Sequence, residues 1–65
     1  MNIEINYKRL SNNAADVAME VAEYAYPKTV AGCWKTLDAW LVAERITQTT
    51  YNEIKENVTF EVVED

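Results

Sequence analysis

The sequence contains no histidine and only one cysteine, one glycine and one proline. Because Cys33 is the single cysteine, a disulfide within the chain is excluded, and so is the usual structural zinc site of cysteine and histidine ligands. A single glycine also excludes a Gly-rich phosphate-binding loop. The scarcity of glycine and proline, with a hydrophobic share of 49%, is typical of a folded chain. We therefore expect a folded domain that holds no metal and no cofactor.

Long hydrophobic runs and an export signal are also missing. No apolar stretch approaches the roughly 20 residues that cross a bilayer. Residues 1–5 have neither a basic start nor a continuous apolar segment, unlike a signal peptide. Together with one unpaired cysteine, these features predict a cytoplasmic protein that has no membrane contact.

Basic residues are few, since six stand against eleven acidic ones and leave a net charge of −5. Such a chain is repelled by nucleic acid and by anionic membranes at long range. The charge favours either plain solubility or binding to a basic protein. Contact with nucleic acid is therefore not the first expectation.

The length of 65 residues predicts one small domain, residues 1–65. A chain of this size buries only about 60% of its unfolded surface and is marginally stable alone. Chains this short often add disulfides, a metal or a partner subunit. With the first two excluded, we expect association with a second copy.

The middle of the chain carries the strongest periodic pattern, which predicts a helix from about Lys28 to Arg45. Its apolar side is formed by Val30, Cys33, Trp34, Leu37, Trp40 and Leu41. Its other side has small residues, namely Gly32, Thr36, Ala39 and Ala43. A helix that is apolar on one side and small on the other is usually covered on both. This pattern predicts a homodimer, formed by the wide apolar faces of this helix and the preceding one.

The segment before this helix contains a strand and another helix. Residues 1–7 alternate between apolar and polar side chains, which predicts a strand. Its buried face should hold Ile3, Ile5 and Tyr7. Residues Ala14–Ala25 have helical periodicity, with Asn13 as the expected N-cap and Asp16 as its capping-box partner. Pro27 ends this helix and suits the first turn of the next.

The last third of the chain predicts a short helix followed by a strand. Thr47 is the expected N-cap of a helix from Gln48 to about Glu56, with a hydrophobic staple between Ile46 and Tyr51. Residues 58–63 alternate again and predict a strand. The connection before Gln48 is short, so the second and third helices should form a tight αα-hairpin.

These elements predict a mainly helical α+β fold in the order strand–helix–helix–helix–strand. The alternative is an all-α three-helix bundle with extended termini. The two strands can pair with each other or with their copies in another subunit. Two isolated strands need a helix layer over one face to be stable in water.

Residues that could perform catalysis are sparse. Asp16, Glu20 and Glu23 form a narrow acidic line on the first helix, where no apolar pocket raises a carboxyl pKa. Cys33 lies in the middle of an apolar face and has no histidine to activate it. We therefore expect a protein that is not an enzyme.

The preferred function is that of a small acidic protein-binding regulator or inhibitor that acts as a homodimer. The expected partner is a larger, basic protein. The acidic line would contact this partner, and a tryptophan at the edge of the apolar face would serve as an anchor. The predicted partner-binding residues are Asp16, Glu20, Glu23, Trp34 and Trp40.

A second interpretation compares the last two helices with a DNA-binding helix-turn-helix. Ile46, Tyr51 and Ile54 match the spacing of its buried positions. Polar side chains on and before the third helix would then contact DNA. They are Arg45, Gln48, Thr49, Asn52 and Lys55. Interleaved acidic residues, and Leu41 and Arg45 in place of the motif's small residue and glycine, weigh against this match.

A third interpretation is that the carboxylates imitate a phosphate backbone and block a DNA- or RNA-binding enzyme. The short, acidic and motif-free chain is similar in composition alone to small inhibitory proteins of phages and mobile elements. The carboxylates in question are Asp16, Glu20, Glu23, Glu61, Glu64 and Asp65.

Overall fold

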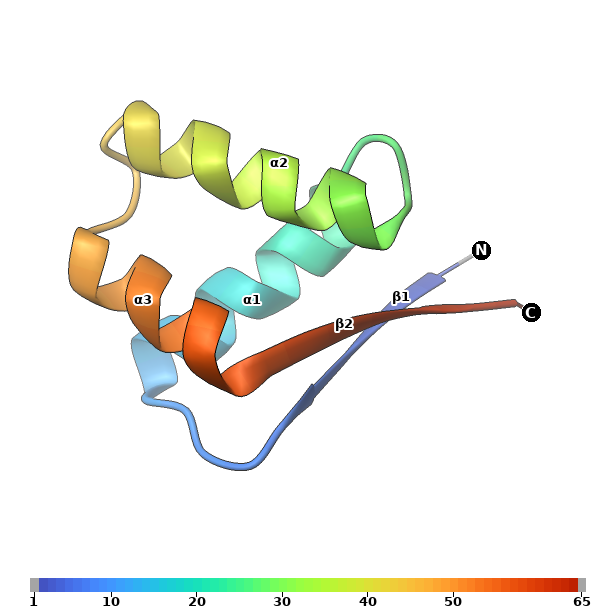
Figure 1. Cartoon of the computed structure of the whole chain (residues 1–65), viewed down its shortest axis with the longest axis horizontal. Coiled ribbons are helices and arrows are strands. Elements are labelled where there is room, and N and C mark those ends of the chain that lie inside the picture. Colours follow the sequence, from blue (N-terminus) through green and yellow to red (C-terminus); the bar gives the residue numbers. More distant parts are fainter. Residues whose placement is uncertain (1, 65) are drawn as a thin grey trace.

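The computed structural model describes residues 2–64, which form two strands and three helices (Figure 1). The elements in chain order are β1 (Asn2–Tyr7), α1 (Asn12–Tyr24), α2 (Val30–Val42), α3 (Gln48–Asn57) and β2 (Val58–Val63). The predicted mainly helical α+β fold is therefore confirmed, and the all-α alternative is wrong.

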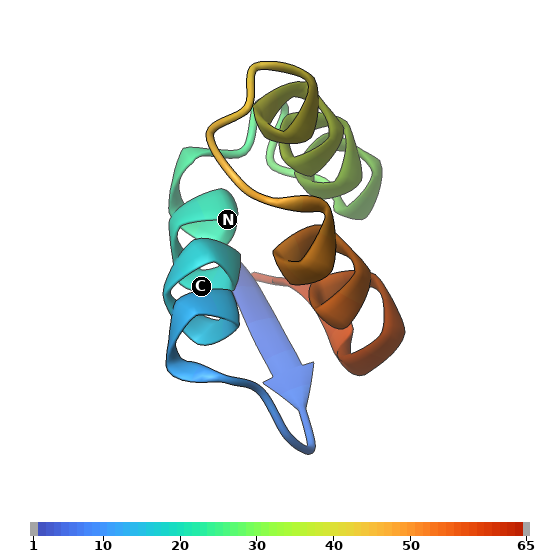
Figure 2. The same cartoon turned by 90° about the vertical axis from the view of Figure 1, so that its left-hand side faces the viewer.

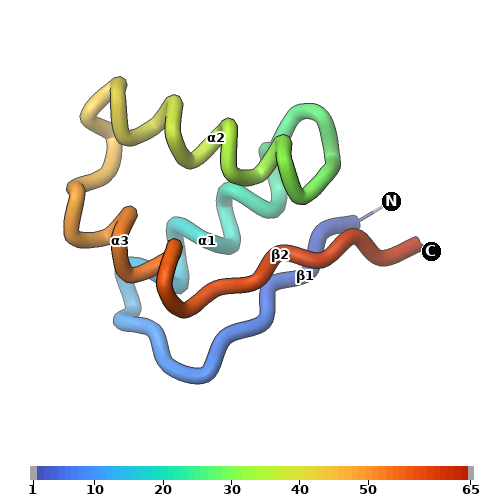
Figure 3. Tube along the Cα trace, viewed as in Figure 1, coloured from blue at the N-terminus to red at the C-terminus, as the bar shows by residue number. Residues whose placement is uncertain are grey.

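The first and last segments pair with each other within the chain. β1 and β2 are antiparallel, with Asn2 opposite Val63 and Tyr7 opposite Val58, so they lie side by side along their length (Figure 3). Ile3 and Ile5 face the helices and are partly buried. Tyr7 was expected on the same buried face but is 50% exposed. It is the last residue of β1, where the chain leaves the sheet toward α1.

The helices form a layer over one face of this two-stranded sheet. α1 packs against β1 and against both other helices (Figure 2). α2 also packs against β2. One hydrophobic cluster joins all five elements, and the described residues that are buried are all hydrophobic or glycine. Its buried members are Ala14, Ala18, Val21, Ala25, Cys33, Leu37, Ile54, Val58 and Phe60.

The N-terminus of α1 begins earlier than predicted, because Ser11 is the N-cap in place of Asn13. The Ser11 hydroxyl accepts a hydrogen bond from the Ala14 amide at 3.2 Å. The Glu53 carboxylate of α3 in turn accepts bonds from the Ser11 amide at 2.6 Å and from its hydroxyl at 3.0 Å. The reciprocal bond of a capping box thus comes from another helix, and Asp16 is not the capping partner.

α2 begins at Val30, two residues after the predicted start at about Lys28, since Thr29 is its N-cap and accepts a bond from the Gly32 amide at 2.9 Å. The Lys28 ammonium reaches back and donates to the carbonyl oxygens of Ala22 and Glu23. Lys28 therefore satisfies free carbonyls at the end of α1. Pro27 lies in the connection, before the cap, and not in the first turn of α2.

α2 also ends earlier than predicted, at Val42, in a Schellman motif. Glu44 adopts a left-handed conformation with φ of 61°. Its amide donates to the Leu41 carbonyl at 3.0 Å, and the Arg45 amide donates to the Trp40 carbonyl at 2.9 Å. The chain then turns into α3, whose predicted N-cap, Thr47, is confirmed by a bond from the Thr50 amide at 3.2 Å.

The small-residue side of α2 divides into two environments. Gly32 is buried, and a Cβ at this position would overlap the carbonyl oxygen of Pro27. Ala39 and Ala43 are exposed, and Val42 beside them is 83% exposed. The chain therefore covers only the first part of this side itself. None of the helices in residues 2–64 is long and apolar enough to cross a membrane.

Candidate binding groove between α1 and α2

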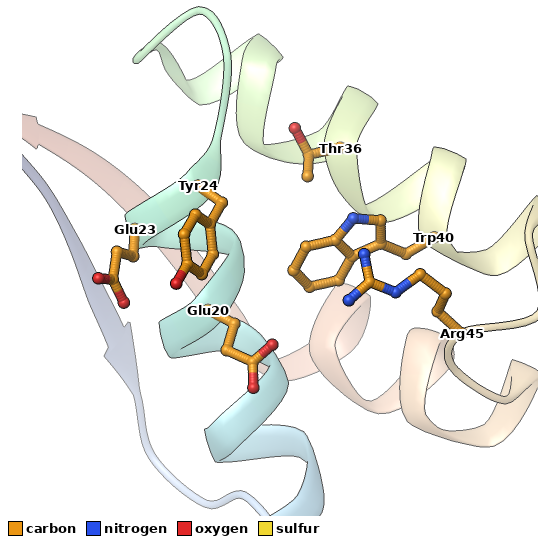
Figure 4. Close-up of a pocket in the computed structure, with 6 residues that line it drawn as sticks. All are labelled: Glu20, Glu23, Tyr24, Thr36, Trp40 and Arg45. Atoms are coloured by element: carbon orange, nitrogen blue, oxygen red, sulfur yellow. The ribbon is translucent and has the colours of Figure 1, made fainter.

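A groove of about 710 Å³ runs between α1 and the C-terminal half of α2 (Figure 4). We call it the α1–α2 groove. Its lining residues are Glu20, Glu23, Tyr24, Thr36, Trp40 and Arg45. The groove thus has an acidic wall from one helix and an aromatic and basic wall from the other.

The α1 wall consists of side chains that the core leaves on the outside of the helix. Val21 and Ala18 face inward and are fully buried, so Glu20, Glu23 and Tyr24 project outward. The Glu20 carboxylate and the Tyr24 ring extend toward the space opposite α2, whereas Glu23 points away from Trp40 (Figure 4). The Tyr24 ring is 65% exposed. Within residues 2–64, neither carboxylate forms an ion pair.

The α2 wall is built by the end of that helix. The Schellman motif turns the chain back at Arg45 and sets its guanidinium over the Trp40 ring, 4.8 Å from the centroid. This is a cation–π contact. Trp40 remains partly exposed beneath it. The C-terminal end of α2 therefore presents an aromatic surface that already holds one cation.

The structure brings together part of the predicted partner-binding set. Glu20, Glu23 and Trp40 line the α1–α2 groove, as described above. Asp16 lies outside it, in a neighbouring recess near Arg45 and the start of α3. Trp34 faces the core instead, where its ring meets Phe60 edge to face at 5.0 Å and 78°. Trp34 is partly buried and belongs to the packing of α2 against β2.

Three lining residues were not predicted as partner-binding residues. Tyr24 lies in the predicted helix Ala14–Ala25 but had no predicted role in binding, and it is largely exposed. Thr36 was grouped with the small side of α2, and Arg45 was considered for DNA contact alone. One signal was available, since Glu20 and Tyr24 are four residues apart and share a helix face.

The predicted DNA-contacting residues are mostly engaged with other side chains. Gln48 donates to Asn52 at 3.0 Å, and the Lys55 ammonium lies 5.6 Å from the centroid of the Tyr51 ring. Arg45 lies on Trp40, as described above, and Thr49 is exposed. The two cations of this set thus each contact an aromatic ring of the chain.

Within residues 2–64, two groups have perturbed acidity, and neither lines the groove. Burial raises the pKa of the Cys33 thiol, with Lys28 acting weakly in the opposite direction, so the thiol is neutral and packs as a core residue. The hydrogen bond from Tyr51 to Asp38, at 2.5 Å, is the main cause that raises the pKa of Tyr51. Within residues 2–64, no three His, Cys, Asp or Glu side chains are grouped to hold a metal ion.

No protein-family model matches the chain, and comparisons with curated proteins and with solved structures give no match either.

Proposed function

We propose that this chain is a non-catalytic, cytoplasmic protein-binding regulator or inhibitor whose α1–α2 groove takes a basic side chain of a larger protein. The observation that supports this proposal is the exposed Glu20 carboxylate beside the exposed Tyr24 ring, facing Trp40 across the groove. A carboxylate next to an aromatic face attracts a lysine or arginine by charge and by cation–π contact.

The chain's own Arg45 limits where a partner cation can sit. Its guanidinium lies over one face of Trp40, and its positive charge disfavours a second cation at that face. A partner cation would enter from the opposite wall, between Glu20 and Tyr24. The partly exposed Trp40 would then provide apolar contact area, since tryptophan is enriched among residues that dominate binding energy.

The groove is tested with the double variant Glu20→Gln, Glu23→Gln. A partner is first recovered from the native cell with the unmodified chain, and its affinity for each variant is then measured. We expect affinity to fall about tenfold, since charge pairs at interfaces contribute on this scale. The matched control, Glu56→Gln with Glu64→Gln, removes the same charge from exposed positions outside the groove and should leave affinity unchanged. Equal losses in both would show that only net charge matters and would overturn the proposal.

Self-association belongs to the same proposal, on a narrower surface than the whole apolar faces of two helices. Most of those faces are turned toward the core. Ala39, Val42 and Ala43 remain exposed together at the end of α2. We expect sedimentation to detect a dimer that Val42→Glu dissociates. A monomer at all accessible concentrations would refute this part.

The line of carboxylates on α1 would allow this chain to inhibit an enzyme by imitating nucleic acid. Asp16, Glu20 and Glu23 are all exposed along that helix. If the partner is a nucleic-acid enzyme, duplex DNA should displace the chain from it. Direct DNA binding is the competing proposal, and a salt-dependent gel shift with the pure chain would support it.

A further inference from the structure

The sheet has only two strands, so β1 has a free edge along its side away from β2. On such an edge, alternate residues present N–H and C=O groups that another extended chain can bind. No other strand lies beside β1 within residues 2–64. The order of the elements leaves this edge open, because α1 follows β1 and packs over its inner face.

An apolar groove of about 330 Å³ adjoins the free edge. We call it the β1 groove. Its apolar lining comes from Ile3 and Ile5 of the strand and from Met19 and Ala22 of α1. Met19 is 58% exposed although it is a large apolar side chain. Glu23 and Lys28 also line the groove, and the Lys28 ammonium is bound to carbonyl oxygens at the end of α1.

The opposite face of the sheet is acidic. Glu4 and Glu61 are directly opposite each other on the two strands, and both are exposed. Like charges in this position are unfavourable. The Asn6 amide donates to Glu61 at 3.1 Å, while no cation pairs with either carboxylate among residues 2–64. A third strand beside β1 would place its outward side chains next to Glu4.

From these features we propose that the β1 edge binds an extended segment of a basic protein as a third strand. Alternate side chains of that segment would point into the β1 groove and toward Glu4 and Glu61. The segment should therefore alternate apolar with lysine or arginine residues. In this mode the backbone bonds provide affinity, and the alternate side chains provide specificity.

A second copy of this chain fits the edge less well. Pairing β1 with β1 of another copy would collect two further carboxylates on the acidic face and join two chains that each have a net charge of −5. A basic segment relieves the same repulsion. The β1 groove and the α1–α2 groove are different sites, because Glu23 is the one residue that lines both grooves.

The probe is a capped peptide of alternating valine and lysine, titrated into the isotope-labelled full chain. We expect the amide signals of Ile3 to Tyr7 to shift and to exchange more slowly with solvent. A peptide of the same composition, with all valines before all lysines, should bind more weakly because it cannot face both surfaces at once. A peptide of alternating valine and glutamate should not bind.

Two variants test the two faces separately. Met19→Glu places a charge in the β1 groove at an exposed position. It should weaken binding about tenfold, a change that corresponds to about 1.4 kcal/mol. Ala31→Glu adds the same charge at an exposed position on α2 that lines neither groove, and should leave binding unchanged. Glu4→Gln with Glu61→Gln should weaken binding about threefold, as expected for exposed charge pairs.

Several outcomes would overturn the proposal. They are absence of binding by the alternating valine–lysine peptide, equal binding of all three peptides, and equal effects of Met19→Glu and Ala31→Glu. Shifts confined to Glu20, Tyr24 and Trp40 would reject the edge and favour the α1–α2 groove. Shifts of β1 that grow with chain concentration alone would identify a second copy as the occupant.

Discussion

Near the two ends of α2, one residue suits its backbone position and one does not. At the start, Gly32 leaves room for the Pro27 carbonyl oxygen, which itself accepts a bond from the Thr29 amide at 2.8 Å. At the end, Glu44 takes the left-handed position that glycine usually fills. Gly32 thus suits its backbone position, whereas Glu44 is held in a conformation that is unfavourable for a residue with a Cβ.

Gly32→Ala should lower the free energy of unfolding by about 1–3 kcal/mol, the usual cost of overpacking. The added Cβ would collide with the Pro27 carbonyl oxygen, and backbone must move to accommodate it. Helix propensity alone predicts the opposite sign, a gain of about 1 kcal/mol. Urea denaturation followed by circular dichroism measures the difference. An unchanged or raised stability would show that the segment between α1 and α2 can shift at little energetic cost.

Glu44→Gly should raise the free energy of unfolding by about 1 kcal/mol, because an L residue with a Cβ is strained at this φ. Glu44→Ala is the matched control, since it removes the same carboxylate and keeps the Cβ. The same urea titration should show no comparable gain for alanine. If both variants gained equally, the charge of Glu44 and not its backbone would be the cause.

At the scale of elements, hydrogen bonds between helices hold α3 in place. Glu53 joins the start of α1 to α3 through Ser11, and Tyr51 joins α3 to α2 through Asp38. α3 therefore contributes one buried side chain, Ile54, and two polar links on its less buried sides. Substituting either link tests whether this helix depends on it.

Glu53→Ala should lower the free energy of unfolding by about 1 kcal/mol, comparable to the loss of an N-cap. It removes both acceptors of Ser11 at the start of α1. Glu56→Ala removes a carboxylate from an exposed position of the same helix and should have little effect. In a double-mutant cycle with Ser11→Ala, the two losses should not add. Additive losses would indicate that the two residues act independently.

Tyr51→Phe should destabilise the chain at neutral pH and remove part of its sensitivity to alkali. Since the Asp38 hydrogen bond raises the pKa of Tyr51 in the folded state, this stabilisation is complete below the unfolded pKa of about 10 and is lost as pH rises above it. Thermal unfolding between pH 7 and pH 11 measures this. Tyr26→Phe, at an 88% exposed position, is the control. Identical alkaline profiles for Tyr51→Phe and the unmodified chain would contradict the link.

At the scale of the whole molecule, local signals predicted the elements, and long-range contacts decided the rest. The cap at Thr47 and the change of period after Asn57 are local, so α3 and β2 were predicted within a residue or two. The cap of α1 depends on Glu53, 42 residues away from Ser11, and could not be inferred from neighbours. The pairing of β1 with β2 was left open for the same reason.

The candidate site was predicted only in part. Helical periodicity indicates which side chains share a face of the helix, but not where a neighbouring helix lies. Glu20 and Glu23 were placed correctly on the outside of α1. Tyr24 of α1 is exposed and lines the α1–α2 groove, and Trp34 and Trp40 face different neighbours although both lie on one helix. These differences depend on how α2 crosses the sheet and α1.

The position of Cys33 makes its thiol a probe of how often the native structure opens. The thiol is fully buried in the cluster to which all five elements contribute, and it is the only sulfhydryl in the sequence. A chromogenic disulfide reagent should therefore modify native protein slowly, and the rate should rise with urea in step with global unfolding. Rapid modification without denaturant would reveal that α2 detaches while the remaining fold persists. One unlabelled, unmutated chain thus suffices to measure how often its interior opens.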